Sequence, residues 1–408
     1  MKRMGARPGD CDNSGDFQVI SHQQQNLSLE QSTDKILKYF STISQQYQPL
    51  QIERLPQNVQ AKLCEETNSS QIPLIEPFQV FEKMRKCKKT KSAVPGEMPA
   101  RLRQEFSVEL AQPAAIIFNN IAQTATWPRS WKDEYGTILK KTSIVEDESC
   151  LRIISITYQL STLMERFVID WLLVYIEDQL DRDQFGGQKG HSIAHYLIEV
   201  SNFILYNQDL SKPMSTLFAG IDIQKGFNKI DHCKIVTILA DMNVPSWLLK
   251  IVASYLSGRT LTLRRQQHMT ATEQMPGGTG AGTPLGLLCF LVLFNKAGPE
   301  ANKASIGEQV TQTKRARKPI KKGKVKWVDD MGVMTSLHLP SSLVPEDRHD
   351  IARPVPYRGR LGLRLPEEDN QLQTELDSLR LYAEQHLMSI KWKLKWDLRR
   401  IIWRRDDS

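Results

Sequence analysis

Two aspartates, Asp329 and Asp330, stand between two short apolar runs in the segment VKWVDDMGVM. Asp and Gly are favoured in tight turns, and an apolar run on each side of such a turn is typical of a β-hairpin. The turn can be an ordinary solvated one. It can also be a metal site, because Mg²⁺ takes oxygen ligands such as carboxylates. The pattern therefore predicts a hairpin and leaves both roles open for its two aspartates.

A third aspartate, Asp222, lies near the end of the apolar strand that we expect at Met214–Ile223. A charge at the end of a buried strand is costly unless it is paired or binds a cation. Alone, such an aspartate is more commonly a helix cap or a surface residue. Carboxylates on neighbouring strands can meet at one edge of a sheet, so Asp222, Asp329 and Asp330 together indicate a metal site.

A glycine-dense segment, PGGTGAGTPLG, precedes the apolar helix expected at LLCFLVLFNKAG. Glycine lets the backbone approach a ligand closely, and backbone amides at the start of a helix can face a nucleotide or a template. On composition alone, a plain flexible loop is the favoured interpretation. The order of these features along the chain is rare. An aspartate at an apolar strand comes first, this loop second, and a pair of aspartates in a hairpin third.

In this order the segments resemble the reverse transcriptases of non-LTR retrotransposons, over roughly Phe81 to Lys395. GIDIQKGFNKIDH resembles the first palm motif, GGTGAGTPLGLLCFLVLFN the second, and KWVDDM the aromatic-x-Asp-Asp motif. ILKK and LRIIS are similar to the fingers strands, and QFGGQKGHS to the segment that precedes the palm. YAEQHLMSIKWKLK resembles the helix and the lysine-bearing turn after the palm.

The resemblance implies an α+β, right-hand polymerase fold with fingers, an antiparallel palm sheet backed by helices, and a mostly missing thumb. It implies an RNA-directed DNA polymerase that adds dNTPs to a DNA primer on an RNA template, with two Mg²⁺ ions, or Mn²⁺ in their place. Asp222, Asp329 and Asp330 are the implied catalytic and metal-binding residues. Asp330 ranks last among them, because neighbouring residues on a strand point to opposite faces.

The resemblance also implies a nucleotide-binding set, which comprises Lys140, Lys141, Arg152, Phe227 and Gly282. The three cations fall where basic residues hold the triphosphate in the family. Phe227 falls where an aromatic ring excludes a 2′-hydroxyl, whereas an RNA-dependent RNA polymerase would place a small or polar group there. Each has an ordinary alternative, since lysines in short basic runs are usually solvated and Phe227 can pack in the core.

Basic segments supply the expected contacts with nucleic acid. Lys and Arg number 54 against 46 Asp and Glu, and the isoelectric point is about 9.0, which fits a polyanionic partner. The expected nucleic-acid-binding residues are Arg315, Arg317, Lys318, Lys321 and Lys322 in a stretch that continues to Lys324, and Lys393 and Lys395 among tryptophans near the end. A solvated loop is the ordinary alternative, and a nuclear-import signal would account for the first segment nearly as well.

With 408 residues the chain is longer than one compact core usually carries, so we expect two or three lobes. We expect a polar, loosely ordered leader at 1–70 with a helix near Leu29–Ile43, fingers at 71–210 and a palm at 211–345. Residues 346–408 would hold a post-palm helix at Glu368–Leu387 and a basic tail. Scattered cysteines, the absence of an apolar signal region and the shortness of the apolar runs predict an intracellular chain, in the nucleus or cytoplasm, with no membrane span.

Departures from the family pattern favour a second hypothesis. Gly280-Ala281-Gly282 stands where the family has Pro-Gln-Gly, and Ala281 cannot supply the amide of the glutamine. Lys391 stands where an Asn is common, and the chain ends at Ser408 with little room for a thumb. The alternative is a catalytically decayed relic that keeps the fold and binds nucleic acid. The aspartates favour the enzyme, and Ala281 favours the relic.

Overall fold

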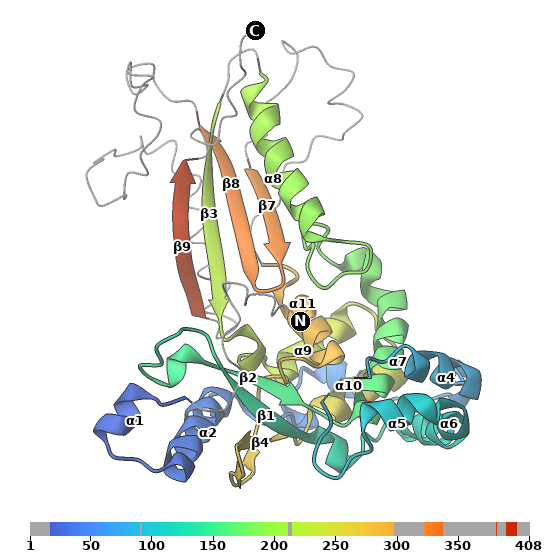
Figure 1. Ribbon diagram of the computed structural model, residues 1–408. Coiled ribbons are helices and arrows are strands. Elements are labelled where there is room, and N and C mark those ends of the chain that lie inside the picture. Colours follow the sequence, from blue (N-terminus) through green and yellow to red (C-terminus); the bar gives the residue numbers. More distant parts are fainter. Residues whose placement is uncertain are drawn as a thin grey trace, which may run out of the picture. The chain divides into compact units, whose positions relative to one another are not determined.

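The computed structural model describes residues 17–89, 92–210, 214–297, 322–337, 381 and 389–397. It contains helices and strands together (Figure 1), as expected for an α+β polymerase fold. The chain divides into two compact units, each made of two stretches. The first unit is Met1–Leu180 with Phe227–Leu293, and the second is Asp181–Gly226 with Phe294–Ser408. The two units interleave along the sequence, whereas the sequence led us to expect consecutive lobes.

The first unit contains a sheet in the order β2-β1-β4-β5, with β6 also paired to β4. Its strands are β1 (Asp133–Lys140), β2 (Leu151–Ile156), β4 (Thr260–Arg265), β5 (His268–Met269) and β6 (Glu273–Gln274). β1 pairs antiparallel with β2 and parallel with β4. The segments ILKK and LRIIS, which we expected as fingers strands, therefore pair with each other, and β4 joins them in the same sheet.

The described part of this unit also contains helices. They are α1 (Ile20–Gln24), α2 (Leu29–Gln45), α3 (Gln57–Cys64), α4 (Pro77–Arg85), α5 (Ala100–Glu105), α6 (Ser107–Thr124), α7 (Gln159–Ile176), α9 (His232–Asp241), α10 (Ser246–Leu256) and α11 (Pro284–Phe294), whose last residue falls in the second unit. α6 ends at Ala125, which adopts a left-handed conformation (φ 49°), three residues before Pro128. No helix within the described ranges is long and apolar enough to cross a membrane.

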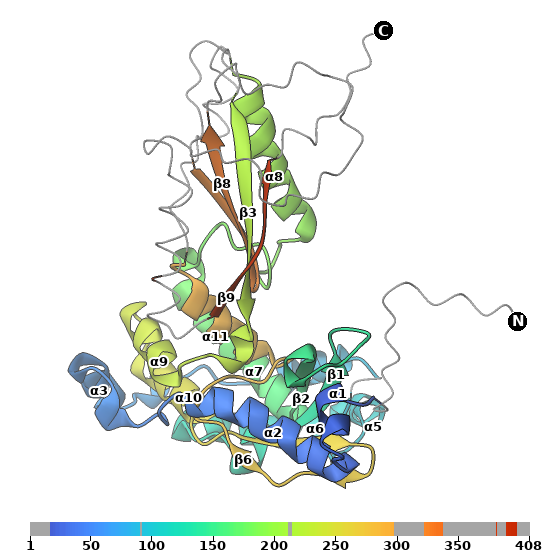
Figure 2. The same cartoon turned by 90° about the vertical axis from the view of Figure 1, so that its left-hand side faces the viewer.

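The segment expected as a loosely ordered leader is folded in the structure from residue 17 onward, and Figure 2 shows α2 as a long helix. Ser28 begins α2 in a capping box with Gln31, which satisfies backbone amides at the helix start. The apolar face of the segment is buried in a cluster with β1, β2 and β4. This cluster includes Phe17, Val19, Ile36, Leu37, Phe40, Ile138, Leu151, Ile153, Leu261 and Leu263. The many glutamines of this segment led us to expect little order, although its apolar residues lie together on one buried face.

The second unit contains an antiparallel sheet in the order β7-β8-β3-β9. Its strands are β3 (Ser215–Gln224), β7 (Lys322–Trp327), β8 (Asp330–Leu337) and β9 (Ser389–Asp397). β7 and β8 form the expected hairpin, and β9 occupies a segment that we expected as a turn and basic tail. The expected helix at 368–387 lies outside the described residues, apart from Leu381.

Helix α8 (Ile193–Gln208), which the sequence analysis did not predict, lies beside β7 and β3 (Figure 1). A buried cluster of Phe185, Phe203, Val325 and Met334 joins the helix to the sheet. Partly buried Tyr196, Val200, Phe218 and Trp327 extend this cluster. One face of the sheet is therefore packed, and its strands can hold fixed positions for the polar residues they carry.

Candidate active site

Asp222 and Asp330 face each other across neighbouring strands. In the antiparallel register of β3 and β8, Asp222 is directly opposite Asp330. Residues directly opposite each other project from the same face of a sheet, so the two carboxylates share one face. Both side chains are half-buried, while Ile221, Ile223 and Met331 beside them in sequence are buried. Like charges directly opposite each other are destabilising, and a cation between them removes that repulsion.

The turn of the hairpin carries Asp329. Trp327 pairs with Asp330, so Val328 and Asp329 are the two turn residues. The Asp329 carbonyl accepts a hydrogen bond of 3.2 Å from the Ile223 amide, which ties the turn to β3. Strand alternation does not fix the direction of a turn side chain. The register thus makes Asp330 the direct cross-strand partner of Asp222, while the expected ranking of the three aspartates as metal ligands stays a prediction.

Val328 holds an unusual backbone conformation in this turn, with a φ of 57°. A positive φ at a β-branched residue is a genuine outlier, and such conformations cost about 1–3 kcal/mol unless surrounding contacts impose them. Two-residue hairpin turns require a positive φ at their first central position, where Gly, Asn or Asp is usual. The turn that carries the aspartate is therefore strained, and other contacts must hold it.

These carboxylates suit a divalent cation that substrate groups also bind. No group of three or more His, Cys, Asp or Glu side chains forms a metal cage within the described part of the chain. Mg²⁺, however, usually takes one or two carboxylates from the protein and completes its shell with water and substrate phosphates. Two carboxylates on one face of a sheet fit that mode of binding.

Tyr196 of α8 is a neighbour of this site that the sequence analysis missed. Burial raises the pKa of Tyr196, and the negative charge of Asp330 raises it further. Its ring also makes an edge contact with Phe185, 6.4 Å between centroids. The phenol therefore stays protonated beside the aspartate. Nothing in the local sequence pattern relates position 196 to position 330.

Lys324, the last residue of the stretch that we expected to contact nucleic acid, and Lys326, two residues further along β7, are both buried. Asp181 Oδ2 lies 3.0 Å from Lys324 Nζ and 2.7 Å from Lys326 Nζ. Lys326 Nζ also donates to the carbonyls of Phe294 (2.9 Å) and Asn295 (3.1 Å). Burial lowers the pKa of Lys326 to about 8. These two lysines are therefore bound to partners inside the second unit.

For the other residues that we expected to contact nucleic acid, the structure gives at most the strand in which each one lies. Lys322 begins β7, and Lys393 and Lys395 lie in β9. Arg315, Arg317, Lys318 and Lys321 lie outside the described residues. All seven stay predictions.

The glycine-rich loop, residues 277–283, lies in the first unit and is hydrogen-bonded along its length. Gly278 and Thr279 donate to the carbonyls of Ile230 (2.7 Å) and Phe227 (2.8 Å). At its far end, the Ala281 carbonyl accepts from the Ser155 amide of β2 at 2.9 Å. The loop is therefore fixed to β2 on one side and to the segment after β3 on the other, rather than flexible.

His232 at the start of α9 contributes to the same restraint. It is buried, and its Nε2 lies 2.7 Å from the Gly278 carbonyl. Burial lowers the pKa of His232 to about 4, so the ring is neutral at pH 7 and its Nε2–H donates to that carbonyl.

A buried ion pair underlies this loop. Glu134 Oε1 accepts from Arg259 Nε (2.8 Å) and Nη2 (2.7 Å), and Arg259 Nη1 donates to the Tyr255 carbonyl. The Tyr255 hydroxyl contacts Thr283 Oγ1, which donates to the Gly280 carbonyl at 2.9 Å. A chain of polar contacts thus runs from the pair to the loop.

Phe227 and Gly282 are placed beside or within this loop. The Phe227 ring stacks on Phe290 of α11, with centroids 5.2 Å apart, and is half-buried. Gly282 is exposed and has a φ of 112°, a conformation that favours glycine. Ala281, at the position of the family's Gln, is half-buried.

The three expected triphosphate-binding cations do not share one face of the sheet. Lys140 pairs with Leu151, and Leu139 pairs with Arg152. Lys140 thus projects with the buried face, and Arg152 projects from the other face. Arg152 and Lys141 are exposed, and Lys141 follows the end of β1. Arg152 and Lys141 are accessible to an anion, while Lys140 is half-buried.

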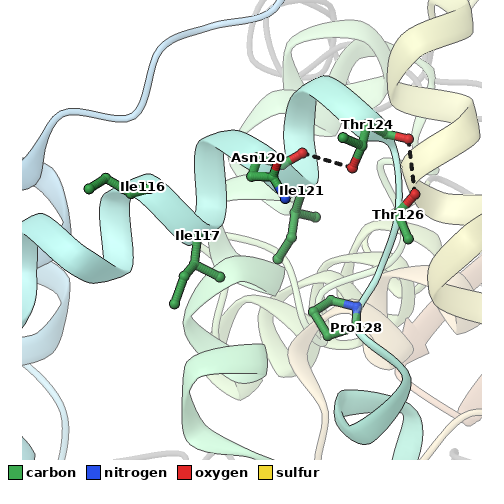
Figure 3. Close-up of a pocket in the computed structure, with 7 residues that line it drawn as sticks. All are labelled: Ile116, Ile117, Asn120, Ile121, Thr124, Thr126 and Pro128. Atoms are coloured by element: carbon green, nitrogen blue, oxygen red, sulfur yellow. Dashed lines mark hydrogen bonds between the residues drawn. The ribbon is translucent and has the colours of Figure 1, made fainter.

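A hollow of about 520 Å³ lies at the end of α6 in the first unit (Figure 3). Ile116, Ile117, Ile121 and Pro128 line it, and Thr124 donates to the Asn120 carbonyl within its wall. None of its lining side chains titrates, so it offers no acid, base or metal ligand.

The chain is similar to known proteins over a range that includes these residues. Residues 138–336 match the family described as "Reverse transcriptase (RNA-dependent DNA polymerase)". This match runs from β1 to β8 and includes Asp222, the glycine-rich loop and the hairpin. The chain is also similar to the "RNA-directed DNA polymerase from mobile element jockey" of Drosophila melanogaster, with 25% identity over 181 residues. That alignment covers 44% of this chain and 19% of the relative, so the chain corresponds to a small part of that protein.

Proposed function

Residues 138–336 are a reverse transcriptase domain of the kind that non-LTR retrotransposons carry, and from this premise we propose that the chain is an RNA-directed DNA polymerase. The reaction would add a deoxynucleotide to the 3′-hydroxyl of a primer on an RNA template. The observation that carries the proposal is the register of β3 and β8, which puts Asp222 opposite Asp330. In this proposal the sheet of the second unit is the palm, and the sheet of the first unit belongs to the fingers.

Divalent ions are general to this family, and Asp222 and Asp330 would hold them, with Asp329 in the turn as a further ligand. When bound, two such ions activate the attacking hydroxyl and neutralise charge on the leaving pyrophosphate. The protein's own contribution is to hold the carboxylates on one face of a rigid sheet. Mg²⁺ fits these ligands best, because oxygen donors and substrate phosphates suit it.

Residues of the first unit would bind the nucleotide. Exposed Arg152 and Lys141 would pair with the triphosphate, since cations form strong hydrogen bonds with phosphate oxygens. Phe227, fixed against Phe290, would exclude a 2′-hydroxyl. Gly282 would let the backbone of the loop approach the substrate.

A second candidate function has its own supporting observation. Ala281 stands where the family has a glutamine, and its methyl side chain has no amide with which to contact a nucleotide. The chain would then be a decayed relic that keeps the fold and binds RNA or DNA through its basic segments. Such binding weakens steeply with salt and leads to no extension.

The test is incorporation of deoxynucleotides on a primed homopolymer RNA with Mg²⁺ or Mn²⁺. We expect Asp222→Asn and Asp330→Asn each to lower the rate by about a thousandfold, because metal-ion stabilisation contributes several kcal/mol. Asp241→Asn, at an exposed position at the end of α9, is the matched control. Full activity in Asp222→Asn would refute the assigned site. If the folded wild type is inactive, Ala281→Gln distinguishes a single lost contact from a relic.

A further inference from the structure

The segment after Asp181 forms an extra edge on the hairpin strand β7. Phe185 donates its amide to the Lys326 carbonyl (2.8 Å), and Lys326 donates to the Asp183 carbonyl (2.7 Å). Gln184 forms a parallel bridge with Lys326 between these two bonds. The segment therefore runs alongside β7 and ends next to the turn that carries Asp329.

Gln184 reaches this turn with both ends of its side-chain amide. Its Nε2 donates to the Val328 carbonyl at 3.3 Å, and its Oε1 accepts from the Val328 amide at 3.0 Å. The same Oε1 accepts from Gly186 at 3.1 Å, and Gln184 is only 3% exposed. A carboxamide is both donor and acceptor, so it satisfies the two backbone groups of Val328 as a neighbouring strand would.

Val328 is the residue at which the turn is strained. Its φ of 57° is unfavourable for a β-branched side chain and persists only when the surroundings impose it. The contacts with Gln184 lie on the amide and the carbonyl of this residue. They are therefore placed to impose the conformation, and with it the backbone path into Asp329 and Asp330.

Gly186 shows how closely the segment fits the turn. A Cβ atom at position 186 would lie 2.6 Å from the Val328 nitrogen and 3.0 Å from the Trp327 carbonyl carbon. Backbone atoms cannot yield as a flexible side chain can. Glycine at 186 therefore permits the approach that lets Gln184 reach the turn.

We infer that Gln184 is a positioning residue, whose side-chain amide holds the strained turn and so sets the arrangement of the metal-binding aspartates. The catalytic consequence rests on the proposed function, but the hold on the turn does not. Gln184→Met keeps a similar volume and removes the two hydrogen bonds with Val328 together with the one from Gly186. Gln188→Met is the matched control, because Gln188 lies in the same segment and donates to the Asp181 carbonyl instead of the turn.

The first measurement is hydrogen–deuterium exchange at the Val328 amide, together with direct binding of Mn²⁺ followed by electron paramagnetic resonance. In Gln184→Met we expect exchange at least about tenfold faster and Mn²⁺ binding about tenfold weaker, the effect of one lost buried hydrogen bond. Gln188→Met should leave both unchanged. In steady-state incorporation, Gln184→Met should lower kcat about tenfold and leave the KM for dNTP unchanged.

Two results would overturn the inference. One is an unchanged Val328 exchange rate in a folded Gln184→Met protein. The other is a Val328 amide in the wild type that exchanges as fast as the amides of an open turn. This measurement needs no variant, so it tests the inference even if Gln184→Met does not fold. A wild type with no incorporation but a protected Val328 amide and Gln184-dependent Mn²⁺ binding would contradict the proposed function alone and support the role of Gln184.

Discussion

Each unit of the molecule has a buried cation–carboxylate pair near that unit's own candidate functional residues, and the two pairs differ in chemistry. In the first unit, Arg259 is 1% exposed and binds Glu134 through two nitrogens. In the second unit, Lys326 is fully buried and lies 2.7 Å from Asp181. The first pair supports the glycine-rich loop, and the second supports the strand that leads into the hairpin turn.

The difference shows that similar burial gives unlike responses to pH. Burial disfavours both charges, but the carboxylate of Glu134 and the ring of Tyr255 offset it for Arg259, whose pKa is raised. Burial outweighs the attraction of Asp181 for Lys326, whose pKa falls to about 8, with Lys324 lowering it and Asp183 raising it. The loop is thus held by a permanent charge and the hairpin strand by a titratable one.

Glu134→Gln should have the largest effect, because Arg259 cannot lose its proton and would remain buried without its anion. We expect a loss of about 3–5 kcal/mol in the free energy of unfolding, the usual effect of breaking a buried pair. Urea denaturation followed by circular dichroism measures it. Arg259→Met combined with Glu134→Gln should recover part of the loss. A loss below about 1 kcal/mol, the scale of an exposed pair, would show that the pair does not anchor the first unit.

Gly280→Ala tests how closely the loop packs on its pair. A Cβ at 280 would lie 2.6 Å from Glu134 Oε2 and 2.7 Å from Ser155 Cβ. Overpacking of this kind costs about 1–3 kcal/mol, measurable as a lower urea midpoint. Ala281→Gly adds no atom at the neighbouring position and is the control. An unchanged midpoint in Gly280→Ala would mean that the loop moves freely away from the pair.

Asp181→Asn should show the smallest effect, and that effect should depend on pH. The folded pKa of Lys326, about 8, lies below its unfolded value of about 10.4. Folding therefore releases a proton, and stability rises with pH between these values. Without Asp181 the folded pKa falls further, so Lys326 is neutral already at pH 7 and the variant's deficit relative to wild type should shrink by about 1 kcal/mol from pH 7 to pH 9.

Glu134→Gln is the control for this measurement, because its deficit involves an arginine that stays charged and should be the same at both pH values. Urea titrations of the two variants at pH 7 and pH 9 therefore test the comparison directly. If the stability deficits of both variants changed equally with pH, the two ion pairs would not differ in their response to pH.

The local sequence pattern was sufficient to predict those elements that a short window of residues determines. The two apolar runs around the aspartates predicted the β7–β8 hairpin, and the apolar run after the glycine-rich segment predicted the helix that the structure shows as α11. Such features follow from periodicity and turn chemistry within a short window. The order of Asp222, the glycine-rich loop and the hairpin was also sufficient to indicate the family, which the match to residues 138–336 confirms.

Features that depend on distant partners could not be predicted. Lys324 and Lys326 look like members of a solvated basic run, and only their pairing with Asp181 shows that they are buried. The preference for Asp330 as the partner of Asp222 depends on strand register, which alternation within one strand does not fix. Gln184 meets Val328 at a separation of 144 residues, and no local rule relates them.

The pairing of β9 with β3 has a consequence for where this fold can be divided. The family match ends at residue 336, yet residues 389–397 pair with β3 on the side opposite β8. A piece cut at the end of the match would leave the backbone donors and acceptors along that side of the Asp222 strand without their partners. Open strand edges of this kind recruit strands from other molecules. The range that matches the family is thus shorter than the range that this sheet needs to cover both sides of β3.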